Sequence, residues 1–299
     1  MKRLLLILAL VASAVSYGET KTYTGADNGD WFADGNWDPE GVPTAADDVM
    51  IAGKRVKAQT GAITANSLTL AGESELHLGK ATLEPGTIAT IENDLSVTDG
   101  AKLYVYAGAL TDLGVFADSI ASHAAATAAI YANPTVVSVG GTFTVEKGAV
   151  VYPENEPVTG AAVFFKPADF VLAAGGEINT TLRGWDLMKV TGHPENAPSC
   201  SKVQVGSGGT DWCWTYAFGV GYQYGNGAGY GGSANKTAKV AASGSIPVAW
   251  TSGVAYGNAY APFWAGSSGT AADDSGYPGG GAIIIEAVRS FTLAGWLDA

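Results

Sequence analysis

The sequence has few residues of the kinds that most often carry chemistry. Its 299 residues include two cysteines and three histidines, and only 15% of the residues are charged. No G-x-S-x-G, H-E-x-x-H or P-loop motif occurs, so no serine-hydrolase, zinc-protease or P-loop site is indicated. Basic residues are also scarce, since 16 lysines and arginines stand against 28 aspartates and glutamates, a formal net charge of −12. This charge argues against nucleic acid as a partner.

Long apolar runs are equally scarce. The one that stands out, Leu4 to Ala12, follows two basic residues and precedes a series of small residues. It is shorter than the roughly 20 residues that a membrane-spanning helix needs. The pattern predicts a secretory signal peptide at residues 1–18, with a buried N-terminal helix as the alternative. We therefore expect a secreted or cell-surface protein whose mature chain has no transmembrane segment.

The two cysteines, Cys200 and Cys213, lie thirteen residues apart. Export favours a disulfide between them, and closing that loop is worth about 3 kcal/mol in the chain-entropy model. Two free thiols are the first alternative. A metal site with His193 is the second, although a zinc site needs more ligands than these three residues supply.

One pattern occurs five times along the chain. Each copy begins with a polar residue, continues with apolar–x–apolar, and reaches a glycine before an apolar residue resumes. The copies are SLTLAGESELHL (67–78), DLSVTDGAKLYV (94–105), TFTVEKGAVVYP (142–153), DFVLAAGGEINT (169–180) and SFTLAGWLDA (290–299).

The alternation places the paired apolar side chains on one face of a strand. We expect eight of them to point inward, and we expect the glycine of each copy to form a turn with positive φ. The eight are Leu68, Leu70, Leu95, Val97, Phe143, Val145, Phe170 and Leu172, and the glycines are Gly72, Gly100, Gly148, Gly175 and Gly295.

Successive copies lie 27, 48, 27 and 121 residues apart. A period of 27 suits one coil of a β-solenoid, and 48 suits one coil with an excursion or two short coils. The predicted fold is all-β, a right-handed parallel β-helix, with coils over 54–199 and a terminal strand over 282–299. A β-sandwich or jelly roll is the alternative.

The segment 19–53 is predicted to cap the first coil. Trp31 and Trp37 lie six residues apart and precede a proline turn and a β-branched strand. Such residues form an aromatic plug over apolar side chains that the first coil would otherwise expose. An aromatic platform for a sugar is the alternative.

Four aspartates of this segment, Asp27, Asp30, Asp47 and Asp48, are candidate calcium ligands. Their spacing does not match an EF-hand loop, and turn formation is the simpler interpretation. The sequence thus predicts no cofactor, with calcium as the alternative.

Glycine and aromatic residues concentrate late in the chain. Residues 206–281 hold 19 of the 41 glycines and 13 of the 30 aromatic residues, which predicts an ordered Gly/aromatic-rich region over 200–281. A G-x-G-x-x-G match at 227–232 lacks the strand and helix that a dinucleotide site needs. The rings can instead supply stacking faces for a glycan. The candidates are Trp212, Trp214, Tyr222, Tyr230, Trp250 and Trp264.

Both ends of the chain resemble one protein family. The opening with Trp31, Asn36–Trp37, Gly41, Pro43, Asp47–Asp48 and Val49-x-Ile51 resembles the N-terminal cap of large secreted bacterial β-helix surface proteins, of the autotransporter-passenger or adhesin type. The segments GAGYGGS (227–233), AYGNAYAP (255–262) and 276–299 resemble their glycine-rich module. In that family the last pattern continues into more coils, so the resemblance implies a truncated or early-terminating member.

These observations predict a non-catalytic, exported scaffold or adhesin-like module. Its expected partner is a surface glycan or another cell-envelope component. The alternative is a polysaccharide lyase or glycoside hydrolase on the same scaffold. A lyase would need an arginine or lysine beside clustered acids, and Arg55, Arg183 and Arg289, the arginines after the signal peptide, do not lie in acidic clusters of the sequence.

Overall fold

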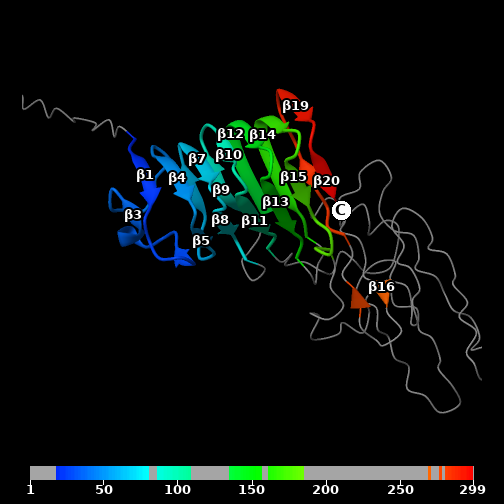
Figure 1. Cartoon of the computed structure of the whole chain (residues 1–299), viewed down its shortest axis with the longest axis horizontal. Helices are drawn as coiled ribbons and strands as arrows, with labels where there is room; N and C mark the ends of the chain where they lie inside the picture. Colours follow the sequence, from blue (N-terminus) through cyan, green and yellow to red (C-terminus); the bar gives the residue numbers. More distant parts are fainter. Residues whose placement is uncertain are drawn as a thin grey trace, which may run out of the picture.

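The computed structural model describes residues 18–80, 86–108, 135–156, 161–184, 269–270, 276–277 and 280–298. Within these ranges the chain is all-β, with one 3-10 turn, η1 (Asp34–Asn36), and no α-helix. Figure 1 shows the strands succeeding one another along the long axis, from β1 in blue to β19 and β20 in red.

The larger sheet, here the first sheet, has 11 strands, and all its pairs are parallel except β1 with β3. Its strands are β1 (Thr20–Tyr23), β3 (Trp37–Asp38), β4 (Asp48–Ala52), β6 (Ile63–Ala65), β7 (Ser67–Ala71), β9 (Thr87–Ile91), β10 (Leu95–Val97), β12 (Thr135–Val145), β14 (Val163–Leu172), β18 (Ile284–Ile285) and β19 (Ser290–Leu293).

The second sheet has seven strands, and every pair in it is parallel. In spatial order they are β2 (Gly29–Asp30), β5 (Arg55–Ala58), β8 (Glu75–Leu78), β11 (Lys102–Tyr106), β13 (Val150–Glu154), β15 (Glu177–Asn179) and β20 (Trp296–Asp298). A separate antiparallel pair joins β16 (Gly269–Thr270) to β17 (Gly276–Tyr277).

The five copies of the sequence pattern lie on neighbouring strands in matching register. The first apolar residue of each copy pairs with that of the next, in the order Leu68, Leu95, Phe143, Phe170 and Phe291. The second half of each copy lies in the second sheet, on β8, β11, β13, β15 and β20. The repeat therefore corresponds to one strand in each sheet.

The unequal spacing of the copies leaves the register unchanged. Leu95 pairs directly with Phe143, 48 residues later, and Phe170 pairs directly with Phe291, 121 residues later. The extra residues in these intervals therefore do not separate the paired strands. For the 48-residue interval this supports the interpretation of one unit plus an excursion.

Inward-facing side chains of both sheets form one hydrophobic cluster. The eight residues predicted to point inward are each at most 1% exposed, which confirms that prediction. The ring centroid of Phe143 lies 5.4 Å from that of Phe165 and 5.5 Å from that of Phe170. Alternation with period two thus gives both sheets one apolar face.

Glycine makes the turn that leads from the first sheet to the second. Gly72, Gly100, Gly148 and Gly175 have φ between +58° and +84°, as the sequence predicts. The prediction is wrong for Gly295, which does not adopt positive φ. There a Cβ atom would lie 2.3 Å from the carbonyl oxygen of Gly176, so close backbone approach requires the glycine.

The N-terminal end of the stack carries the predicted aromatic plug. Trp31 and Trp37 are 0% and 3% exposed, and their rings meet edge to face at 4.8 Å. Tyr23 packs against Trp37 at 5.2 Å, and Trp37 Nε1 donates a hydrogen bond to the carbonyl of Trp31. Antiparallel β3 ends the first sheet beside this plug.

The polar residues that open the five copies, together with Asp48 on β4, form a ladder along the first sheet. Acidic and hydroxyl residues alternate from strand to strand, in the order Asp48, Ser67, Asp94, Thr142, Asp169 and Ser290. The hydroxyls of Ser67 and Ser290 donate to Asp48 and Asp169 at 2.6 and 2.7 Å, and the backbone N–H of Thr142 donates to Asp94 at 2.7 Å. We call this set the Asp/Ser ladder.

Candidate binding surface on the second sheet

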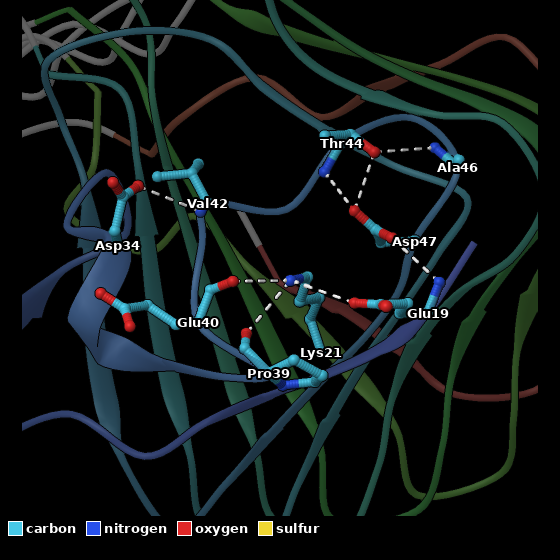
Figure 2. Close-up of polar contacts among 9 residues, drawn as sticks. All are labelled: Glu19, Lys21, Asp34, Pro39, Glu40, Val42, Thr44, Ala46 and Asp47. Carbon is cyan, nitrogen blue, oxygen red and sulfur yellow. Dashed lines mark hydrogen bonds and ion pairs between the residues drawn. The ribbon is translucent and has the colours of Figure 1, made fainter. Parts of the chain in front are cut away.

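The polar residues near the N-terminus form hydrogen bonds with one another and with the backbone of the same segment. Figure 2 shows the Asp47 carboxylate between the backbone N–H groups of Glu19 and Thr44, which donate to it at 3.0 and 2.8 Å. The Thr44 hydroxyl also donates to Asp47 at 2.8 Å. Burial opposes ionisation of Asp47, but these hydrogen bonds outweigh it and lower the pKa of the carboxyl group.

Lys21 occupies the centre of the same region. Its side chain is only 9% exposed, and Nζ donates to the carbonyls of Pro39 and Glu40 at 3.1 Å each (Figure 2). The Glu19 carboxylate lies 3.5 Å from Nζ. The buried ammonium group is therefore matched by three oxygen atoms, and its role is to join the loop at 39–40 to β1.

The other three aspartates considered as calcium ligands point to different partners. Asp27 binds the Arg55 guanidinium, Asp30 accepts from the backbone of Phe32, and Asp48 accepts from Ser67. Within the described ranges, no three carboxylate, histidine or cysteine side chains are grouped as a metal site. These hydrogen bonds fit the turn-forming interpretation of the aspartates.

The outer face of the second sheet instead brings polar aromatic residues together. His77, Tyr104 and Tyr152 occupy the same register position on β8, β11 and β13. The ring of Tyr104 lies parallel to that of His77 at 4.4 Å and near-parallel to that of Tyr152 at 4.7 Å. These separations match the spacing of strands in a sheet, so the backbone register produces the stack. We call these three residues the ring ladder.

Tyr106 and Arg183 adjoin the ring ladder. The Tyr106 hydroxyl lies 3.2 Å from Nδ1 of His77, within hydrogen-bond distance. The Arg183 guanidinium lies over the Tyr152 ring, 4.3 Å from its centroid, and it pairs with Glu154. A cation over an aromatic face is attracted by the ring quadrupole, so Arg183 covers the end of the ladder.

A column of charged residues runs along the other side of the ring ladder. Arg55, Glu75 and Lys102 are register partners on β5, β8 and β11. Lys102 Nζ donates to Glu75 at 3.2 Å, and this hydrogen bond raises the pKa of Lys102. Opposite charges on adjacent strands attract, and Arg55 is paired in addition with Asp27, so each cation of this column has a carboxylate partner.

Burial acts on the titratable rings of this face. It lowers the pKa of His77, against the opposing effect of the Glu75 carboxylate, so the imidazole is neutral at pH 7. Burial also raises the pKa of Tyr104 and Tyr106. All three rings are therefore uncharged at neutral pH and can both donate and accept hydrogen bonds.

This surface was not among the sites predicted from the sequence. Its signal is the spacing of the repeat applied to the second half of each copy, because His77 and Tyr104 are 27 residues apart and Tyr104 and Tyr152 are 48 apart. The apolar positions of the copies are alike in residue type, whereas the positions between them are not, so the repeat predicts the core and not this surface.

The candidate sites of the Gly/aromatic-rich region lie outside the described residues. This holds for the cysteine pair and for all six candidate stacking residues: Cys200, Cys213, Trp212, Trp214, Tyr222, Tyr230, Trp250 and Trp264. The disulfide and the glycan-stacking rings remain predictions, as does the signal peptide at 1–18.

The three arginines that follow the predicted signal peptide each pair with a carboxylate. Arg55 binds Asp27, and the other two pairs are Arg183 with Glu154 and Arg289 with Asp169. In the part of the chain that the structure describes, no helix is long and apolar enough to cross a membrane. Comparison of the chain with protein-family models, with curated proteins and with solved structures gives no match.

Proposed function

We propose that the chain coils as a right-handed parallel β-helix. The support is the regular return of the chain to the second sheet, since every strand of that sheet directly follows a strand of the first sheet. Parallel strands of one sheet are joined by right-handed crossovers in about 98% of cases, because of the twist of the strands. The same rule supports the right-handed form here.

On this scaffold we propose an exported, non-catalytic role as an adhesin-like module that presents a surface to a glycan or cell-envelope component. A stack of like units builds an extended surface, since each unit contacts only its neighbours. The observation that carries the proposal is the in-register pairing of the five sequence copies, from Leu68 to Phe291. It gives both sheets a long outer face with repeated side-chain columns.

A glycan array run beside an assay for released sugar ends tests this role. The exported protein is applied to the array, and the same preparation is incubated with soluble polysaccharides while reducing and unsaturated ends are measured. We expect binding without release. Release of either kind of end above a heat-denatured control would overturn the non-catalytic role and establish the lyase or hydrolase alternative.

A negative array also has a clear meaning. If the protein binds no glycan but binds whole envelope preparations that have been stripped of polysaccharide, the partner is an envelope protein or lipid. If it binds neither, the adhesin-like role is wrong, and the scaffold has no partner at the cell surface.

A further inference from the structure

The geometry points to the ring ladder and its neighbours as a binding surface for a neutral polysaccharide, and we propose that a hydroxyl-rich chain docks on the outer face of β8, β11 and β13. The proposal rests on the adhesin-like function proposed above and names a site for it. It places the site in the second sheet rather than among the aromatic residues of 206–281.

The charges on this face select for a neutral ligand. Glu75 is bound to Lys102, and Glu154 is bound to Arg183. Each carboxylate is therefore balanced by a cation within contact distance. The further cation of this column, Lys57, is the register partner of His77 on one side and of Asp30 on the other, away from Tyr104 and Tyr152. Beside Tyr104 and Tyr152, an ionic ligand would have to break one of these pairs, whereas a hydroxyl group can bind the outer edge of a pair without separating it.

The hydroxyl groups of the ladder indicate hydrogen bonding to a ligand. Stacking on a neighbouring ring requires only the ring, so phenylalanine at 104 and 152 would satisfy the packing of β11 against β13. Among the described residues, no hydrogen bond engages the hydroxyl of Tyr104 or Tyr152. These phenols, one on each of two adjacent strands, can donate to and accept from successive sugar hydroxyls.

The surface is also rigid before any ligand arrives. The Tyr104 ring is held between His77 and Tyr152, and the Tyr152 ring lies between Tyr104 and the Arg183 guanidinium. Side chains that are already ordered lose little conformational freedom on binding. A row of weak hydrogen bonds to sugar can then give measurable affinity.

The test compares a variant that removes only the two hydroxyls with one that removes hydroxyls from the other sheet. The first is Tyr104→Phe/Tyr152→Phe, and the matched control is Thr69→Val/Thr144→Val on the outer positions of β7 and β12. Circular dichroism and the melting temperature establish that each variant is folded like the original chain.

The probes are soluble neutral polysaccharides (a β-1,3-glucan, a xylan, a mannan and dextran) and two anionic ones (polygalacturonate and alginate), immobilised for biolayer interferometry. We expect the unaltered full chain to bind at least one neutral polymer. Its affinity should be about equal at about 0.05 M and about 0.5 M salt, since screening acts only on charges. Tyr104→Phe/Tyr152→Phe should weaken that binding about tenfold, and the threonine variant should leave it unchanged.

Three results would overturn the proposal. The first is binding to the anionic polymers alone, and the second is no binding to any neutral polymer. The third is binding that the tyrosine variant leaves intact; if Trp212→Ala/Trp214→Ala abolishes it, the site lies in the Gly/aromatic-rich region. In this last case the adhesin-like function stands and only the site is wrong. Release of sugar ends would instead overturn the non-catalytic function, whatever the tyrosine variant does.

Discussion

The side chain of Val97 is fully buried between two register partners, Leu70 on one side and Val145 on the other. Val97→Asp would place a carboxylate among apolar side chains with no partner, which costs more than about 3 kcal/mol. We expect the variant to lose most of its stability in urea or thermal unfolding. Ser96→Asp changes the neighbouring outward position on the same strand and should cost less than about 0.5 kcal/mol. Equal losses in the two variants would contradict the inward orientation of Val97.

The ion pair of Asp27 and Arg55 should make the stability of the fold depend on pH. Hydrogen bonds from the side chain and backbone of Arg55 lower the pKa of Asp27 to about 2, from a usual value of 3.8. A carboxyl group with a lowered pKa contributes its stability above its unfolded pKa, and the contribution is lost as the pH falls through the folded value. The pair should therefore stabilise the fold fully above about pH 4.5 and cease to do so near pH 2.

A carboxyl-detected NMR titration checks this prediction. We expect a midpoint near 2 for Asp27 in the unaltered chain. In Arg55→Gln the midpoint should move back toward the ordinary aspartate value of about 3.9. An unchanged midpoint in Arg55→Gln would show that another group holds the carboxylate.

Among the elements, the Asp/Ser ladder depends on alternation along the first sheet. Ser67→Asp would put three carboxylates in a row on adjacent strands, at Asp48, 67 and Asp94. Like charges directly opposite one another destabilise a strand pair by up to about 1 kcal/mol each, so we expect a loss of about 1–2 kcal/mol at pH 7. The loss should shrink below about pH 4, where the carboxylates become protonated.

Thermal unfolding of Ser67→Asp at pH 7 and pH 3.5 measures this effect. Thr69→Asp is the matched control, because it adds the same charge at the next outward position of β7, outside the ladder. A deficit of the same size in both variants, or one that does not depend on pH, would show that alternation in the ladder is unimportant.

The strands of the first sheet could be predicted from the sequence because their inward residues are constrained in two ways. Leu68, Leu95 and Phe143 must be apolar, and each directly follows a polar residue and precedes a glycine by four or five residues. The turn geometry expected at Gly295 was wrong because a glycine can be required for either of two reasons. It permits positive φ, and it also permits another backbone to approach closely, and the sequence does not distinguish them.

The ring ladder was harder to predict, because outward positions share no residue type. The same column reads Lys57, His77, Tyr104, Tyr152 and Asn179 from β5 to β15. Only the register shows that three of these rings are neighbours, and the register crosses an interval of 48 residues between β11 and β13. The number of aromatic residues in the Gly/aromatic-rich region suggests a binding site there, whereas the rings of the ladder are few and far apart in sequence.

For the whole molecule, Leu68 and Leu95 are register partners on adjacent strands and lie 27 residues apart, the length of one unit. One such unit should therefore be dispensable. Deleting residues 67–93 removes 27 residues and brings β10 and β11 into the places of β7 and β8. Because each unit contacts only its neighbours, we expect the shortened chain to fold cooperatively, with the same circular dichroism signature and a lower melting temperature.

Deleting residues 67–92 is the control, since it differs by a single residue. It leaves one surplus residue before Leu95, which must either bulge out or turn the apolar side chains of the strand to the outer face. We expect this variant to be less stable than the 27-residue deletion. Equal melting temperatures for the two would show that register between units does not govern folding.

The direct pairing of strands that lie 48 and 121 residues apart has a consequence for how such a protein can diversify. Many residues intervene at the corners that follow β11 and β15, yet β12 and β18 pair in register with their neighbours in the first sheet. The number of residues between these strands is therefore decoupled from the core, and lengthening a connection costs little entropy. New segments can be gained, lost or exchanged at these two corners while the buried residues stay under the same selection, so the two corners are natural grafting points for foreign peptides.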